Sequence, residues 1–189
     1  LVSFISIRDD RAPDPNPDNT DEEILKRRAL AAHKVLDSWY LMPGIQETGE
    51  LDKKELIDWV DVARKHCSEN GHGIGGDLRI GFMLARSPVG EDGYWPHTAV
   101  RDAIEHLGSR LIEEHIEMGV YNSRGVVSRG LEDGGRQERD LVERYQAMSD
   151  ALKGKWPRTA AMLRSLARSY TEDAKRNDLD ADLRNLRRG

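Results

Sequence analysis

The chain has 189 residues, a third of them charged and only 6% aromatic, with a formal net charge of −5. This length suits one domain with a sizeable core. Leu, Ala, Arg and Glu outnumber Ile and Val, which favours helix and argues against a β protein. No apolar run approaches the roughly 20 residues that cross a bilayer, and no cleavable signal peptide is recognisable. A single cysteine, Cys67, excludes an internal disulfide and suits a reducing compartment, so we expect a soluble cytoplasmic protein.

The first 19 residues predict an extended arm or linker. Leu1–Ile7 alternates loosely with a period of two, as one short strand would, and residues 9–19 hold three prolines and four aspartates. We therefore place a domain boundary near Asn19. Because the chain begins with leucine instead of methionine, we also expect it to be a piece or a processed form of something longer.

Hydrophobic periodicity predicts an all-α domain over residues 20–175, an irregular bundle of about six helices. Thr20 with Glu23, and Asp52 with Glu55, have the spacing of capping boxes at two of the helix starts. In the central helix, the stripe of apolar residues includes Met118. The predicted helices cover residues 20–42, 52–70, 78–86, 95–118, 136–152 and 156–175.

Three short features of this pattern receive specific interpretations. Trp95-Pro96 is expected to open the central helix, with the proline in its first turn. Gly108-Ser109 offers a flat place for close helix packing within that helix. Arg101 and Glu105 are interpreted as an i,i+4 pair on a solvated face.

The segment Gly119–Gly135 is the one predicted connection too long for a plain linker. Unstructured connections beyond roughly 12–15 residues in compact domains are usually functional or disordered. Val120-Tyr121 and Val126-Val127 flank an Asn-Ser-Arg-Gly turn, which predicts a tiny hairpin.

Arginine side chains in and after this loop make it the candidate binding site. Guanidinium groups and the exposed amides of a helix start both suit phosphate or carboxylate. The candidate binding residues are Asn122, Arg124, Arg129 and Arg136. In the alternative interpretation, these arginines form ion pairs with carboxylates of the same chain. The candidate carboxylates are Glu132, Asp133 and Glu138.

Patterns for catalysis and metal binding are weak. Gly71–Gly76 formally matches G-x-G-x-x-G, but a charged helix end precedes it where a strand is required, so the glycines predict a helix stop and turn. His106 and His115 are nine residues apart, about 900° around one helix, and cannot share an ion. Cys67 adjoins His66, yet consecutive helical residues diverge by about 100°. We identify no catalytic residue, metal site or cofactor, and favour a protein that is not an enzyme.

Charge is unevenly distributed along the chain. Residues 151–189 carry ten Lys or Arg against five Asp or Glu, which leaves −10 for residues 1–150. A basic last helix can meet nucleic acid, although it is more often a solvated face. Half of residues 176–189 are charged, and we expect this tail to fray.

Seven short blocks form a combined pattern: Gly76-Asp77-x-x-Ile80-Gly81, Leu84-Ala-Arg-Ser-Pro88, Asp92-Gly-x-Trp-Pro96, Val100-Arg-Asp102, Asn122-Ser-Arg-Gly-Val126, Gly134-Gly-x-Gln-Glu-Arg139 and Pro157-Arg-Thr-Ala160. Together they resemble a helical carboxy-terminal region of large bacterial multidomain proteins. The resemblance covers roughly residues 25–175 and carries no assigned activity or site residue. It implies an accessory module of a longer polypeptide.

The first functional hypothesis is a helical protein-interaction or accessory module that binds through the loop 119–135 and adjacent helix ends. Its partner is a protein or a missing upstream domain of the same chain. Alanine at Arg124 and Arg129 should then leave the free energy of unfolding within about 1 kcal/mol while weakening partner capture. The alternatives are nucleic-acid binding through the basic last helix, and a phosphate or carboxylate small-molecule site at the arginine loop.

Overall fold

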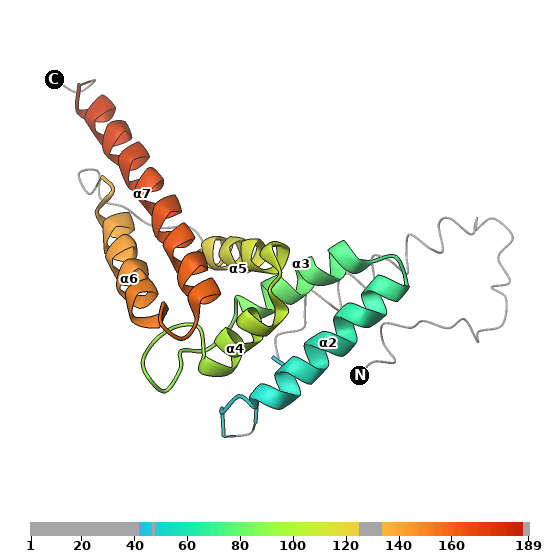
Figure 1. Ribbon diagram of the computed structural model, residues 1–189. Helices are drawn as coiled ribbons and strands as arrows, with labels where there is room; N and C mark the ends of the chain where they lie inside the picture. The colour runs from blue at the N-terminus through green and yellow to red at the C-terminus, as the bar shows by residue number, and fades with distance from the viewer. Residues whose placement is uncertain (1–41, 47, 125–133, 187–189) are drawn as a thin grey trace, which may run out of the picture. The chain divides into compact units, whose positions relative to one another are not determined.

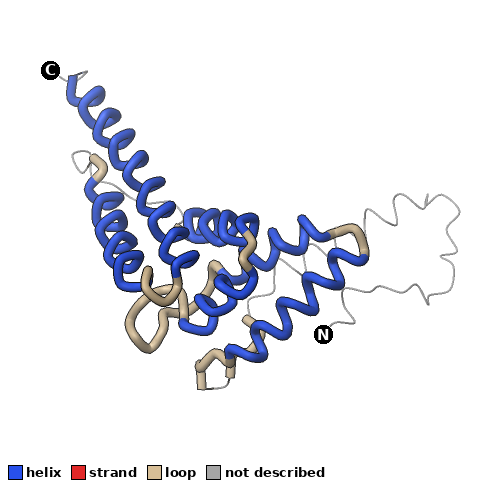
Figure 2. Tube along the Cα trace, in the orientation of Figure 1, coloured by secondary structure: helices blue, strands red, loops and turns tan. Residues whose placement is uncertain are grey.

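The computed structural model describes residues 42–46, 48–124 and 134–186, and within these ranges the chain is helical, with no strand (Figures 1 and 2). The predicted all-α fold is confirmed. The arm and the first predicted helix precede Met42 and lie outside the described residues. The described helices are α2 (Lys53–Glu69), α3 (Gly73–Leu84), α4 (Thr98–Leu107), α5 (Arg110–Ser123), α6 (Arg136–Leu152) and α7 (Pro157–Leu186).

Helix α2 begins and ends where its sequence signals predict. The Asp52 carboxylate accepts a hydrogen bond from the Glu55 amide at 2.8 Å, which satisfies one of the free amides of the first turn. Asn70 caps the other end, and Gly71 follows with φ of +74°. These contacts lie within a few residues of one another, so the sequence predicts both ends well.

Helix α3 begins at Gly73, five residues before the predicted start, so the expectation of a turn through all of these glycines was wrong. Gly76 explains the difference. A Cβ atom on Gly76 would lie 2.7 Å from the Cβ of Cys67 on α2. Gly76 therefore lets α3 lie closely against α2, and Gly71 serves as the turn.

The predicted central helix is in fact two helices. Gly108 adopts φ of +56° and caps α4, while the Ser109 hydroxyl accepts a hydrogen bond from the Ile112 amide at 3.4 Å and caps α5. Gly108-Ser109 is thus a helix stop followed by a helix start, not a packing surface inside one helix. Because the break changes the direction of the chain, Met118 does not join the buried stripe and is 49% exposed.

The start of the central helix was also misplaced. Trp95-Pro96 precedes α4 as a cis peptide, and α4 begins at Thr98 with His97 as its cap. The helix predicted to begin at residue 156 does start there, because Pro157, which follows Trp156, is the first residue of α7.

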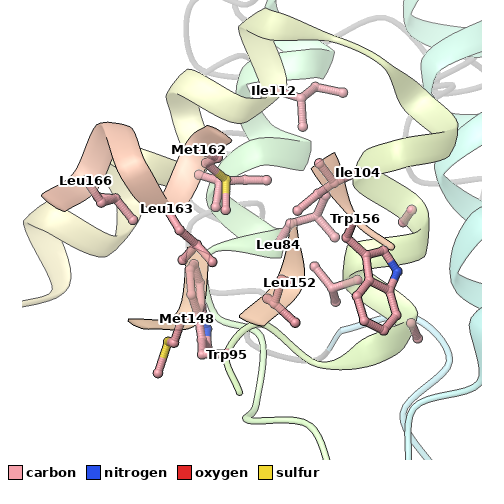
Figure 3. Close-up of a cluster of buried hydrophobic side chains, with 14 of the residues drawn as sticks. Leu84, Trp95, Ile104, Ile112, Met148, Leu152, Trp156, Met162, Leu163 and Leu166 are labelled. Atoms are coloured by element: carbon pink, nitrogen blue, oxygen red, sulfur yellow. The ribbon is translucent and has the colours of Figure 1, made fainter. Parts of the chain in front are cut away.

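The core forms where α3, α4 and α5 meet α6 and α7. Helix α7 lies against α4, α5 and α6, and α2 lies against α3 and α4. Figure 3 shows the centre of this core, to which α3 through α7 each contribute side chains. Burying one large aliphatic side chain stabilises a fold by about 1.5–3 kcal/mol. The labelled core residues are Leu84, Trp95, Ile104, Ile112, Met148, Leu152, Trp156, Met162, Leu163 and Leu166.

One fully buried arginine holds the loop before α4. Arg101 has no exposed surface, and its guanidinium donates to both carboxylate oxygens of Asp92 at 2.6 and 2.8 Å. It also donates to the carbonyl oxygens of Tyr94 and Pro96, the latter at 2.6 Å. The expected solvated pair with Glu105 was therefore wrong.

Glu105 instead caps a helix that begins more than fifty residues later. Its carboxylate accepts hydrogen bonds from the amides of Arg158 and Thr159 at 3.2 and 2.9 Å, and from the Thr159 hydroxyl at 3.1 Å. A carboxylate at this position also favours the positive end of the α7 dipole. Helices α4 and α7 are thereby joined by a polar contact at the edge of the core.

Helix α7 is much longer than the α6 helix beside it. It has 30 residues against 17, about 45 Å against about 25 Å at 1.5 Å per residue. It continues to Leu186, through the residues predicted to fray from Arg176 onward. Even so, no helix within the described ranges combines the length and apolarity needed to cross a membrane.

Candidate functional site

The predicted binding region lies where the end of α5 and the start of α6 meet α7. We call this surface the loop-flanking end and define it as Met118–Arg124, Gly134–Arg139 and Tyr170–Leu186. Residues 125–133, among them the predicted site residue Arg129, lie outside the described residues.

The end of α5 differs from its prediction. The helix continues through Ser123, so Val120 and Tyr121 are helical and do not form the first half of a hairpin. Gly119 lies inside the helix because α5 crosses α3 there, and a Cβ atom on it would lie 2.6 Å from the Cβ of Ala85. The glycine thus marks a helix crossing and not the beginning of the loop.

The side chain of Arg124 is engaged within the chain. Its Nη1 atom lies 2.6 Å from Oε1 of Glu138, a fully buried residue in the first turn of α6. The guanidinium also lies 5.6 Å from the ring centre of Tyr170, in cation–π geometry. This is the internal pairing that the alternative interpretation described, and it ties the end of α5 to the start of α6.

Three tyrosines from three helices stack beside this ion pair. Tyr170 on α7 lies between Tyr121 on α5 and Tyr145 on α6, with ring centres 5.6 and 5.8 Å away. Burial raises the pKa of Tyr170 to about 12. The Tyr121 hydroxyl donates a hydrogen bond to Asp173, and this hydrogen bond raises the pKa of Tyr121. Because these hydroxyls stay protonated at neutral pH, the stack is a structural contact.

The start of α6 is fixed to α7 by a carboxylate. Asp178 accepts hydrogen bonds from the Gly135 amide and from Arg139, both at 2.7 Å. The Gly135 amide, followed by Arg139, lowers the pKa of Asp178. A Cβ atom on Gly134 would lie 2.5 Å from Oδ1 of Asp178, so the glycine allows this close approach. Both borders of the segment 125–133 are thus anchored to a rigid base.

The other predicted site residues lie on the surface of this base. Asn122 and Arg136 are both exposed, at the end of α5 and the start of α6. Exposure leaves them able to contact a partner, whereas Arg124 and Glu138 are engaged with each other.

A groove of about 250 Å³ separates α6 from α7 at this end. Small-molecule sites in proteins usually enclose about 300–1,000 Å³. This groove is smaller, and the cation of Arg139 on its rim already contacts Asp178. Its volume suits a single side chain. The lining residues are Arg139, Val142, Glu143, Thr171, Ala174, Lys175 and Asp178.

Exposed apolar side chains concentrate at the loop-flanking end. Of the ten large apolar residues that are exposed in the described ranges, five belong to it, which makes it the main apolar surface of this part of the chain. Exposed apolar surface is typical of interaction sites, and here it forms two groups, one at the end of α5 and one along the end of α7. These residues are Met118 at 49%, Tyr121 at 43%, Leu179 at 59%, Leu183 at 45% and Leu186 at 79% exposed.

Sequence reasoning missed two parts of this surface for different reasons. The spacing of Leu179, Leu183 and Leu186 at i, i+4 and i+7 was readable, but the surrounding charges led to the prediction of a frayed tail. The tyrosine stack joins residues from three helices and has no local signal.

Sites for metals or nucleophilic catalysis gain no support. In the part of the chain that the structure describes, no three His, Cys, Asp or Glu side chains are grouped as a metal site requires. His106 lies 2.9 Å from Asp61, and His115 contacts the Leu111 carbonyl at 2.7 Å, on a different helix. Burial raises the pKa of the Cys67 thiol, which disfavours the reactive thiolate.

Several cations of the basic last helix have acidic partners. Lys175 pairs with Glu172 at 2.9 Å, and Arg176 pairs with Asp173 at 2.6 Å. Arg158 at the start of α7 pairs with Glu113 at 2.7 Å. These pairs reduce the net positive field along the helix.

In comparisons with known proteins, no family model, no curated protein and no solved structure matches the chain.

Proposed function

We propose that this chain is a helical protein-interaction or accessory module of a larger bacterial protein, and that a protein partner binds its loop-flanking end. The partner is either a separate protein or another domain of the same polypeptide. The observation that carries the proposal is the exposed apolar surface at the ends of α5 and α7. A cytoplasmic location accords with the free Cys67.

The anchoring of this surface supports the proposal further. The Arg124–Glu138 ion pair and the Asp178–Gly135 hydrogen bond fix the two helix ends that border the loop. A fixed surface loses little conformational entropy when a partner binds, which favours affinity.

The two alternatives have weaker support. A small-molecule site at the arginine loop would need Arg124, whose guanidinium is held by Glu138 and Tyr170. A nucleic-acid site on α7 would bring phosphates close to the carboxylates of Glu172 and Asp173, which lie beside Lys175 and Arg176 and weaken the positive field there.

Affinity capture with matched surface variants tests the proposal. The full chain serves as bait in a lysate of the organism that encodes it. Met118→Glu places a charge on the apolar surface, and Val62→Glu makes the same change at a 49% exposed residue of α2. We expect a protein retained by the wild-type and Val62→Glu baits to be lost with Met118→Glu.

Both substitutions should leave the free energy of unfolding within about 0.5 kcal/mol, as surface changes do. Equal retention by all three baits, or no retained protein, would contradict the proposal. Retention of nucleic acid in place of protein would favour the alternative.

A further inference from the structure

The last two turns of α7 carry a ridge of three exposed leucines. Asp178 contacts the first residues of α6, so residues 179–186 extend past the start of that helix. At about 100° per residue, Leu183 and Leu186 lie within about 40° of Leu179 around the helix, and the buried Tyr170 lies about 180° away. We call Leu179, Leu183 and Leu186 the leucine ridge. It faces away from the core.

We infer that the leucine ridge binds the same segment of a second copy of this chain in a short parallel coiled coil. The inference rests on the proposed function, because it assigns a partner to one part of the loop-flanking end. The spacing of the ridge is that of successive d, a and d positions of a heptad, the positions that form coiled-coil seams.

Charges beside the ridge favour a second copy as the occupant. In a parallel coiled coil, a residue at position g of one helix faces the e residue five positions later on the other. With Leu179 at position d, Lys175 is at g and Asp180 at e, so Lys175 of each copy faces Asp180 of the other.

The exchange of ionic partners costs little. Lys175 contacts Glu172 at 2.9 Å, and their side chains are 67% and 60% exposed. Exposed pairs of this kind contribute at most about 1 kcal/mol. Lys175 can therefore turn to Asp180 of a second copy without a large loss.

The same charges disfavour an antiparallel arrangement. When Leu179 of one copy lies opposite Leu183 of the other, Asp180 faces Asp180 and Asp182 faces Asp182. Like charges at these positions repel. Moving the register to place Leu183 opposite Leu186 removes this repulsion, but Leu179 then lies beyond the end of the other helix. Only the parallel register uses all three leucines with opposite charges beside them.

The seam is short, which sets the expected affinity. Arg176 is at position a before Leu179 and is 73% exposed, so the apolar ridge ends there. Two turns bury far less than the roughly 1,200–2,000 Å² of a standard stable interface. We therefore expect a weak, reversible dimer with a dissociation constant on the order of 100 µM.

Sedimentation equilibrium of the purified full chain between about 10 and 500 µM tests the inference. The wild-type chain should pass from monomer to dimer across this range, and Leu183→Asp should remain monomeric. Val62→Asp, the matched control at an exposed apolar residue of α2, should dimerise like the wild type. A wild-type monomer at every concentration, or a dimer that survives Leu183→Asp, would overturn it.

Charge exchange tests the parallel register. Lys175→Glu sets glutamate against Asp180, and Asp180→Lys sets lysine against Lys175, so each variant alone should dimerise on the order of tenfold more weakly. In an equimolar mixture of the two variants both cross-pairs again have opposite charges, and dimers should return. A mixture no more associated than its components would refute the register.

The outcomes also separate this inference from the proposed function. Sedimentation uses the purified chain alone, whereas the capture experiment looks for a different protein and depends on Met118. Dimerisation that depends on Leu183, without any captured protein, supports self-association and contradicts a separate partner. Capture of another protein by a chain that stays monomeric supports the proposed function and contradicts self-association.

Discussion

Arg101 shows how strongly one buried charge can depend on its partners. Its guanidinium is fully buried and satisfies the Asp92 carboxylate and the carbonyls of Tyr94 and Pro96. Arg101→Met leaves the two carbonyls and the 40% exposed Asp92 carboxylate without their donor, and groups left unsatisfied in this way cost about 1–3 kcal/mol. Urea unfolding should show this loss, while the same change at exposed Arg168 should stay within about 0.5 kcal/mol. A small effect of Arg101→Met would mean that the loop holds its form independently.

Acid should weaken the fold through the same contact. The hydrogen bonds from Arg101 lower the pKa of Asp92 from 3.8 to about 2. The unfolded chain therefore takes up this proton more readily, so the stabilisation is complete above about pH 4 and is lost as the pH falls toward 2. Urea midpoints at pH 5 and pH 3 should differ less in Asp92→Asn than in the wild type. An unchanged difference would exclude Asp92 as a cause.

At the scale of the helices, the crossing of α3 over α5 depends on Gly81. A Cβ atom there would lie 2.5 Å from the Cβ of His115 and 2.8 Å from the Ile112 carbonyl oxygen. Gly81→Ala should cost about 1–3 kcal/mol, as overpacked cores do. Gly75 of the same helix has no neighbour within 4 Å, so Gly75→Ala should stabilise by about 0.5–1 kcal/mol. Thermal denaturation of both variants checks the opposite signs, and a shift in the same direction would contradict the crossing.

Helix ends were predictable where their signals are local. Asp52 caps α2, and Pro157 starts α7, as the neighbouring residues indicate. The break at Gly108 was missed because the apolar periodicity continues across it, although a glycine followed by serine is a stop and start signal. The early start of α3 depends on the contact of Gly76 with Cys67, which no local pattern contains.

At the scale of the molecule, the candidate site combines residues that only the tertiary structure brings together. Asn122 and Arg136 were predicted as site residues and are exposed at neighbouring helix ends. The sequence named Glu138 as a possible internal partner of Arg124, but spacing could not decide between this pairing and binding to a partner, because the two side chains meet only through the packing of the helix ends. The spacing of the leucine ridge, in contrast, was visible in the sequence, and only its exposure required the structure.

The ion pair between Arg124 and Glu138 reverses one expectation from the sequence. Because Glu138 is fully buried, Arg124→Ala should lower the free energy of unfolding by about 3 kcal/mol or more. A surface residue would lose no more than about 1 kcal/mol. Arg136→Ala, at an exposed position nearby, should change little. Chemical denaturation of the two variants makes the comparison, and equal losses would show that the pair contributes no more than a surface contact.

The hydrogen bonds that Glu105 accepts make two backbone amides sensitive to whether α4 packs against α7. The amides of Arg158 and Thr159 have no preceding helical turn to accept their hydrogen bonds, and Glu105 of α4 accepts them instead. Their hydrogen-exchange rates therefore register whether α4 is seated on α7. In a shortened chain that lacks α4, or in Glu105→Ala, these two amides should exchange quickly while the amides in the middle of α7 remain slow.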